Sequence, residues 1–250
     1  MTSPRTAPRT AEPEPAQDAA SEDEILTRLL KGLWPGLPTL LAASAAVCTA
    51  AAVTVWLAPG LTPVSVLVAA VLLGPVTAAL MGTVGRIAAA DQATARLWWT
   101  DLRTLAGFGC RQSLLAALPT AVFLTAWPAW TQTGNVLLLP SLAVGGAGAV
   151  LAAPALPAAL ALGSLHPHLR GPTLWRYALH LTIRLPLRFL AAPTLTALGI
   201  WAATRWTASV LLLVPAPAAA VAVAAVWTSV VRLGGGAPGA GAGDHVAHAP

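Results

Sequence analysis

Charged residues are scarce in this chain, and their scarcity excludes most classes of water-soluble protein. They make up 9% of the 250 residues, whereas hydrophobic residues make up 56%. Soluble domains carry about 25% charged residues, so this chain has too few charges to cover a surface in water. The mean hydropathy of +0.71 agrees, and we expect lipid to be the solvent of this protein.

Three long stretches are almost free of charge. Residues 32–85 and 112–169 contain none, and residues 189–231 contain only Arg205. A membrane helix needs roughly 20 apolar residues, so each stretch has room for two spans. Turn-forming residues divide the stretches at 58–63, 131–135 and 204–207. We therefore predict an all-α, polytopic membrane protein whose six spans form three hairpins: Leu37–Leu57, Pro63–Val84, Ser113–Trp130, Val136–Leu162, Phe189–Ala203 and Ser209–Val231. The fifth span is short, and a buried hydrophobic helix is its alternative.

The basic residues predict the orientation of these spans. Of the 14 Lys and Arg residues, all except Arg205 fall on one predicted side of the membrane. Cytoplasmic loops collect Lys and Arg, so we expect both termini in the cytoplasm. The topology then explains the sequence pI of 10.6 without a nucleic-acid partner. Tryptophans at predicted span ends, such as Trp34, Trp56 and Trp227, suit the headgroup layer.

The two ends of the chain differ in composition from its middle. Residues 1–24 are rich in Pro, Ala and Glu without an apolar core, and residues 234–250 are rich in Gly, Ala and Pro. Such segments bury too little apolar surface to fold. We predict disordered cytoplasmic tails at 1–24 and 234–250, and a six-span membrane domain at 25–233.

Cysteine and lysine are rare as well. Cys48 is predicted at mid-membrane and Cys110 in a cytoplasmic segment, so they cannot form a disulfide. The run at residues 234–236 is Gly-Gly-Gly, without the Lys-Ser/Thr step and the helix start of a phosphate-binding loop. An ATPase subunit is therefore not expected.

Two segments between the hairpins have the pattern of amphipathic surface helices. In the first, an apolar face lies opposite a basic face that carries Arg96, Arg103 and Arg111. In the second, the basic face carries Arg176, Arg184 and Arg188. Helices of this kind lie at the surface of an anionic leaflet. The apolar residues are Trp98, Leu102, Leu105 and Gly109 in the first segment and Trp175, Ala178, Leu179, Leu181 and Leu185 in the second. A third such helix is indicated before the first span, over residues 21–33.

A surface helix followed by a membrane hairpin would then occur three times in the chain. Leu97-Trp98 and Leu174-Trp175 each precede an arginine, Arg111 or Arg188, by the same interval. We predict an internal repeat on this basis, with chance similarity of Ala/Leu-rich sequence as its alternative.

The chain from Leu26 to Leu233 resembles the YesL family of bacterial membrane proteins, a domain of unknown function. The resemblance lies in three segments: Leu73–Leu80, Trp98–Leu114 and Leu174–Leu179. This sequence departs from the family at Met81-Gly82, where an aromatic residue is usual, and at Tyr177, where Asn is usual. The resemblance implies a membrane location and an association with carbohydrate ABC import systems, with their permease subunits as partners.

Small residues and prolines inside the spans allow two interpretations. Gly74-Pro75 could form a hinge lining a cavity, but Gly74, Ala78 and Gly82 share one helix face and favour close helix packing. In the fourth span, glycines at 145, 146 and 148 and prolines at 154 and 157 could bend the helix. Close packing is again the favoured interpretation.

Ionisable residues give no catalytic, cofactor or metal site. None lies deep in the predicted spans, and Arg205 can reach the outer surface. His166 and His168 lack further metal ligands nearby, and His245 and His248 lie in the predicted tail. Asp101 is expected to pair with an arginine of a neighbouring loop rather than to act in catalysis, and Asp91 has no evident partner acid or base.

Three functions are compatible with this sequence. We expect a non-catalytic accessory protein of a carbohydrate ABC importer. The alternative is an autonomous transporter or channel for a small neutral solute, to which bent spans would contribute. A membrane enzyme is the least expected, since no convergent polar groups are apparent.

Overall fold

The computed structural model describes residues 22–89, 93–166 and 168–232, which fold almost entirely into helices. Within these residues there is no β-strand. The α-helices are α1 (Glu22–Leu57), α2 (Pro63–Ala88), α3 (Ala95–Thr133), α4 (Leu139–Leu165), α5 (Pro172–Arg184), α6 (Pro186–Arg205) and α7 (Pro215–Arg232). Two short 3-10 helices, η1 (Val136–Leu138) and η2 (Ala208–Leu213), precede α4 and α7.

Six helical segments of the described chain are long and apolar enough to cross a membrane, which confirms the predicted fold class. They cover Leu30–Leu57, Pro63–Ala88, Ala95–Thr133, Val136–Leu165, Pro186–Arg205 and Ser209–Val230. The short fifth span is among them, and it extends beyond its predicted limits at both ends. The protein is thus a multi-pass membrane protein.

The turns between paired spans use the residues that the sequence indicated. Gly60 has a φ of 87° between α1 and α2, and Thr62 then caps α2 by accepting a hydrogen bond from the Ser65 amide. Gly134 ends α3 with a φ of 61°, and the Asn135 side chain accepts a hydrogen bond from the Leu137 amide. Positive φ favours glycine, and side-chain caps satisfy amides that a helix start leaves unpaired.

Two of the predicted surface helices differ from the structure in one respect: each is continuous with the span that follows. Helix α3 has 39 residues, or about 58 Å at 1.5 Å per residue, which is almost twice a hydrocarbon core of about 30 Å. Its first part, with Arg96 and Arg103, therefore extends past the apolar layer. No cap or proline separates the two parts, because Pro119 and Pro128 both lie within the predicted span, so the helix continues through the boundary near Gln112.

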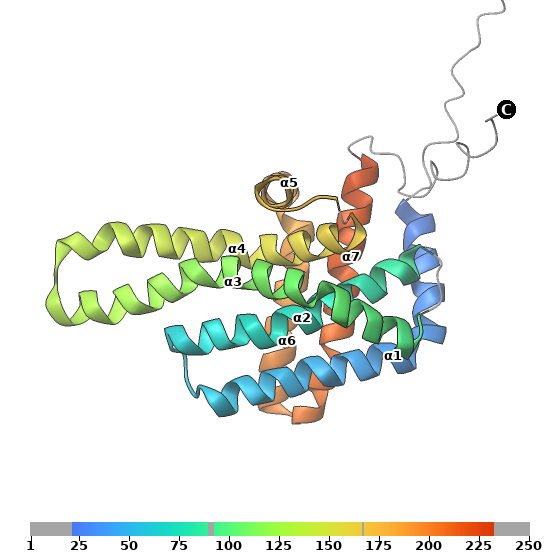
Figure 1. Cartoon of the computed structure of the whole chain (residues 1–250), viewed down its shortest axis with the longest axis horizontal. Coiled ribbons are helices and arrows are strands. Elements are labelled where there is room, and N and C mark those ends of the chain that lie inside the picture. The colour runs from blue at the N-terminus through green and yellow to red at the C-terminus, as the bar shows by residue number, and fades with distance from the viewer. Residues whose placement is uncertain (1–21, 90–92, 167, 233–250) are drawn as a thin grey trace, which may run out of the picture.

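Helix α1 likewise begins at Glu22, so the end of the predicted tail 1–24 is helical. Figure 1 shows its first part descending on the right before the helix changes direction. Pro35 and Pro38 lie inside α1, and proline bends a helix because its ring removes a hydrogen bond and crowds the preceding turn. The remainder of the predicted tails, residues 1–21 and 234–250, lies outside the described residues.

The surface helix between the fourth and fifth spans is separate, as predicted. Helix α5 begins after Gly171, which has a φ of 66°, and ends at Arg184 before Leu185 and Pro186. A residue before proline avoids the helical conformation, and the φ of Leu185 is −131°. Arg188, which was predicted on the same helix, therefore belongs to α6. The internal repeat stays a prediction.

The three hairpins point in different directions. Figure 1 shows α3 and α4 projecting together beyond the other helices, while α6 and α7 run across the direction of α1 and α2. The most extensive helix contact joins α2 to α3, and α2 also packs against α1, α4 and α7. Helix α2 is thus the central element of the fold.

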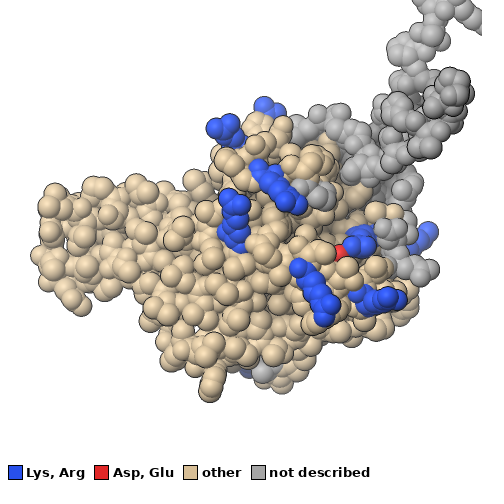
Figure 2. Space-filling view, in the orientation of Figure 1, with Lys and Arg blue, Asp and Glu red and all other residues tan. Residues whose placement is uncertain are grey.

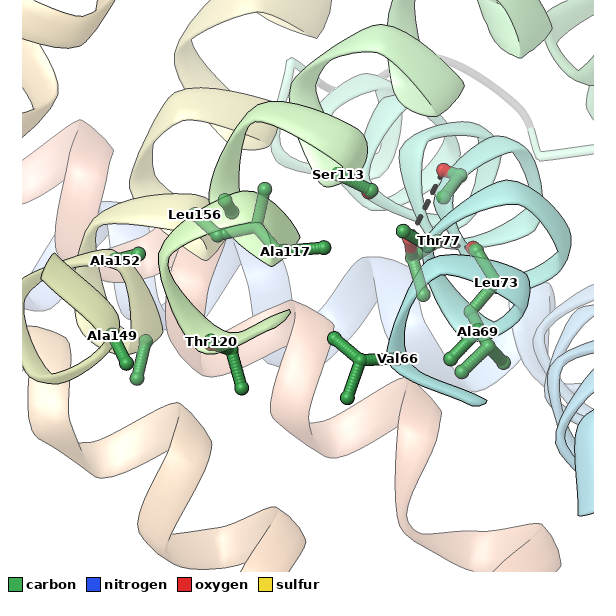
Figure 3. A pocket seen from close by; sticks show the side chains of 14 residues that line it. Val66, Ala69, Leu73, Thr77, Ser113, Ala117, Thr120, Ala149, Ala152 and Leu156 are labelled. Atoms are coloured by element: carbon green, nitrogen blue, oxygen red, sulfur yellow. Dashed lines mark hydrogen bonds between the residues drawn. The ribbon is translucent and has the colours of Figure 1, made fainter. Parts of the chain in front are cut away.

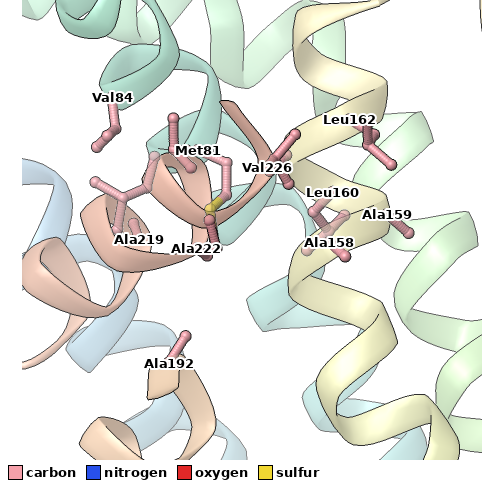
Figure 4. Packing of buried hydrophobic residues seen from close by; sticks show 14 of the residues in the cluster. Met81, Val84, Ala158, Ala159, Leu160, Leu162, Ala192, Ala219, Ala222 and Val226 are labelled. Atoms are coloured by element: carbon pink, nitrogen blue, oxygen red, sulfur yellow. The ribbon is translucent and has the colours of Figure 1, made fainter. Parts of the chain in front are cut away.

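The buried core lies where α2, α4, α6 and α7 meet. Alanine and branched aliphatic residues dominate it: Val84, Ala158, Leu160, Phe189, Ala222 and Val226 are each at most 2% exposed. Figure 4 shows Met81 of α2 facing Ala219 and Ala222 of α7, with the α4 residues beside them. Trp227, predicted in the headgroup layer, is instead 9% exposed and packs in this core, whereas Trp34 and Trp56 are exposed.

Candidate functional site

An apolar cavity of about 540 Å³ lies among α1, α2, α4, α6, η2 and α7, and we call it the large cavity. Its walls consist mainly of Ala, Val, Leu and Pro side chains. Its polar side chains are Cys48 of α1, Thr77 of α2 and Thr196 of α6. A volume of several hundred Å³ is typical of small-molecule sites, so we treat it as the candidate site.

The polar hydrogens in this cavity are directed at backbone carbonyls. The Cys48 thiol donates to the Leu211 carbonyl at 3.3 Å. The Thr77 hydroxyl donates to the Leu73 carbonyl at 2.8 Å, and the Thr196 hydroxyl donates to the Ala192 carbonyl at 3.0 Å. Such intrahelical bonds satisfy hydroxyls in an apolar setting. The lining therefore offers hydrocarbon and a few hydroxyl oxygens, but no free side-chain donor.

A second cavity of about 370 Å³ lies between α2, α3 and α4. Figure 3 shows Val66, Leu73 and Thr77 of α2 on one side and the side chains of α3 and α4 on the other. Leu73, Thr77, Ala153 and Leu156 line both cavities. The two cavities therefore adjoin at these four residues.

The large cavity is closed at one end and open at its side. Beyond Leu80, Leu160 and Ala192, the core residues Val84 and Phe189 are at most 2% exposed and close the end near the start of α6. The lining residues Ala153 of α4 and Thr196, Ala197 and Ile200 of α6 are exposed. The mouth therefore lies between α4 and α6, within the membrane-spanning part of the chain.

Gly74-Pro75 acts as a packing notch rather than as a hinge. Helix α2 continues through Pro75 without a break. A Cβ on Gly74 would lie 2.7 Å from the Gly109 carbonyl oxygen, and a Cβ on Gly109 would lie 2.4 Å from the Gly74 oxygen. Small residues thus let the backbones of α2 and α3 touch.

The glycines of the fourth span serve the same purpose. A Cβ on Gly145 would lie 2.9 Å from the Phe123 amide nitrogen, and one on Gly148 would lie 2.8 Å from the Pro119 ring. Helix α4 runs unbroken from Leu139 to Leu165 through Pro154 and Pro157. The favoured interpretation, close packing, is confirmed.

Three polar contacts fix the helices at the end that carries most of the arginines. Asp101 of α3, 4% exposed, forms an ion pair with Arg86 in the last turn of α2, as the predicted pairing with an arginine required. The Trp175 ring N–H of α5 donates to the Gln112 side-chain oxygen of α3 at 2.7 Å. This contact of Gln112 was not predicted from the sequence, because its partner lies on another helix.

The third contact joins the last hairpin at the same end. The Arg188 guanidinium donates to the Thr228 hydroxyl of α7 at 2.9 Å. Thr228 in turn donates to the Ala224 carbonyl at 2.9 Å. Arg188 is half-buried, so it holds α6 against α7 instead of lining an exposed basic face.

The other arginines of the surface segments are exposed, and we call them the arginine rim: Arg96, Arg103, Arg111, Arg176 and Arg184. Arg103 also lies over the ring of exposed Trp99, 5.0 Å from its centroid. Figure 2 shows the Lys and Arg side chains gathered around α5 and the first part of α3, and none on the projecting α3–α4 hairpin in this view. The apolar face predicted opposite these arginines packs inward instead of into lipid. Leu105 and Trp98 contact the core, and Gly109 contacts α2.

The remaining candidate residues form no common site. His166 and His168 lie at the end of α4 with ring centroids 5.5 Å apart, and the described residues contain no cluster of three or more potential metal ligands. Burial, together with the charge of His168, lowers the pKa of His166. Arg205 is exposed at the end of α6. Cys48 and Cys110 are free thiols. Asp91, His245, His248 and residues 234–236 lie outside the described residues.

Comparison of the chain with protein-family models, with curated proteins and with solved structures gives no match.

Proposed function

We propose that this protein is a non-catalytic accessory subunit of a carbohydrate ABC importer in the bacterial plasma membrane. The observation that carries the proposal is the arginine rim. Five arginines are exposed on α3 and α5, next to helix contacts that use buried polar groups. A rigid basic surface of this kind suits an acidic partner surface, because opposite charges steer and orient association.

The helix contacts beneath the rim support its use as a docking surface. The bond between Trp175 and Gln112 joins α5 to α3 directly beside Arg176 and Arg111. Gln112 is 2% exposed, and a buried polar pair is costly to separate. The arginines on both helices therefore keep a fixed spacing, which favours recognition of a folded partner.

The choice of an importer as partner comes from the resemblance to the YesL family. Two of the segments that carry the resemblance take part in helix packing or in the rim. Leu73–Leu80 contains the packing notch against α3, and Leu174–Leu179 lies in α5. The orientation follows from the charge distribution. In this proposal the arginine rim and both termini lie on the cytoplasmic side, which agrees with the preference of Lys and Arg for cytoplasmic loops.

Affinity purification from membranes of the native host tests this proposal. We expect the tagged full-length chain to retain a sugar-permease subunit at physiological salt and to lose it as ionic strength rises. A variant with Arg96→Gln, Arg103→Gln, Arg176→Gln and Arg184→Gln should lose the permease. Arg205→Gln is the matched control, because Arg205 lies at the C-terminal end of α6 and outside the arginine rim. This variant should retain the permease. Absence of any permease subunit, or equal retention by both variants, would contradict the proposal.

The geometry gives less support to an autonomous transporter of a small neutral solute such as a sugar. A sugar path needs side chains that replace the hydrogen bonds of water to its hydroxyls. The described lining of the large cavity offers no free side-chain donor. Proteoliposomes that take up sugar at a rate above protein-free vesicles would restore this alternative.

A further inference from the structure

We propose that the large cavity holds the hydrocarbon chain of a membrane lipid, which enters sideways between α4 and α6. This inference goes beyond the importer association and does not depend on it. It rests on the size of the cavity, the chemistry of its lining and the position of its mouth.

The cavity is larger than a small apolar molecule needs. An apolar cavity of roughly 150 Å³ is enough to bind benzene, whereas the large cavity measures about 540 Å³. Residues of α1, α2, α4, α6, η2 and α7 contribute to its walls. A flexible hydrocarbon chain can fill a space of this volume.

The chemistry of the lining excludes water and sugars as stable occupants. A buried water needs two to four polar partners. Cys48, Thr77 and Thr196 have directed their hydrogens to backbone carbonyls, and the remaining lining side chains are apolar. A hydrocarbon chain needs no hydrogen bonds, so it is the class of ligand that this lining matches.

The position of the mouth makes the bilayer the source of the ligand. The core residues Val84 and Phe189 close the cavity toward the end with the arginine rim. The exposed lining residues lie on two helices, Ala153 on α4 and Thr196 and Ala197 on α6. The opening therefore faces the hydrocarbon layer, where lipid chains are the surrounding solvent.

Photolabelling of the full-length protein in nanodiscs tests the inference. The probes are a phosphatidylglycerol with a diazirine in one acyl chain and, in a second arm, a free fatty acid with the same diazirine. We expect crosslinks in 153–160 of α4 and 192–200 of α6. Labelling by the phospholipid alone identifies a phospholipid acyl chain as the occupant, and labelling by both probes shows that a free fatty acid enters as well. Either result supports the proposal.

Filling variants supply the control. Ala153→Phe and Ala197→Phe place a ring in the mouth, whereas Ala147→Phe changes an exposed alanine of α4 that does not line either cavity. We expect both filling variants to lose most of the labelling in 192–200 and Ala147→Phe to keep it. Labelling that is equal in all three variants would overturn the proposal.

The Cys48 thiol gives a second measurement that needs no substitution in the cavity. In a Cys110→Ala background, a charged, water-soluble thiol reagent should leave Cys48 unmodified in nanodiscs, because a chain-filled cavity excludes water. The reference is the rate at which Cys110 is modified in the unsubstituted chain. If Cys48 is modified at a similar rate, the cavity is hydrated and the proposal is overturned.

Discussion

A methyl group added at Gly109 should push α2 and α3 apart, while the same change at Gly107 should not. The Cβ of Gly109→Ala would lie 2.4 Å from the Gly74 oxygen and 2.7 Å from the Ala78 Cβ. Both contacts involve backbone or the short side chain of alanine, so no flexible group can move aside. A Cβ on Gly107 has no neighbour within 4 Å.

The size of the effect follows from two terms. Overpacking in a well-packed interior costs about 1–3 kcal/mol. Replacing glycine by alanine in a helix recovers up to about 1 kcal/mol, and this second term is common to both variants. The free energies of unfolding of Gly107→Ala and Gly109→Ala should therefore differ by about 1–3 kcal/mol, with Gly109→Ala the less stable.

Unfolding in mixed micelles of a mild detergent and sodium dodecyl sulfate, followed by tryptophan fluorescence, measures this difference. The protein has 10 tryptophans, which gives a strong signal, and none is changed by either substitution. Equal stability of the two variants would refute the close approach of α2 and α3 at Gly74 and Gly109. It would also remove the basis for interpreting Gly74-Pro75 as a packing notch.

The same unfolding assay tests three further contacts. Trp175→Phe leaves the Gln112 side chain buried without its donor and should cost about 1–3 kcal/mol, part of which Gln112→Leu should recover in the double variant. Arg86→Gln leaves the Asp101 carboxylate unpaired and should lower the free energy of unfolding. Because Arg86 is 38% exposed, we expect a loss of about 1–3 kcal/mol, less than for a fully buried pair. Adding Asp101→Asn to this variant should offset the loss. Burial and His168 lower the pKa of His166 below its ordinary 6.5. As pH falls below that value, the unfolded chain binds a proton before the native one, so stability should decrease. His166→Gln should flatten this dependence, and unchanged pH profiles would contradict it.

The six spans were predictable because they depend on local properties of the chain. A bilayer needs long apolar helices, and the turns at Gly60 and Gly134 need residues that accept positive φ. Those signals lie within a few neighbouring residues. The pairing of Asp101 with an arginine was predictable for a related reason, since arginines far outnumber acids in the segments between the hairpins.

The continuity of α1 and α3 was not predictable from the same signals. The sequence marks a change from basic to apolar residues near Gln112, but a helix does not end where its solvent changes. Only a loss of backbone hydrogen bonding ends it, as at Leu185 and Pro186. Pro35 and Pro38 lie inside α1, where proline bends the helix without ending it.

The candidate site was not predictable because no residue in it has a chemical signature. Cys48, Thr77 and Thr196 are separated in sequence and become neighbours only when the hairpins pack at their observed angles. The hydrogen bond between Trp175 and Gln112 was not predictable for the same reason. The buried position of Trp227 also depends on packing, since its place near the end of a span matched that of an interfacial tryptophan.

Single-cysteine labelling tests most directly whether three hairpins each cross the membrane twice. Cysteines placed in a background without Cys48 and Cys110 at Gly60, Gly134 and Thr207 should all react with an impermeant reagent from the same side of sealed vesicles. Cysteines at Thr100 and Tyr177 should react only from the opposite side. Reaction of the cysteine that replaces Thr100 or Tyr177 from the same side as the cysteine that replaces Gly134 would contradict the six-span account.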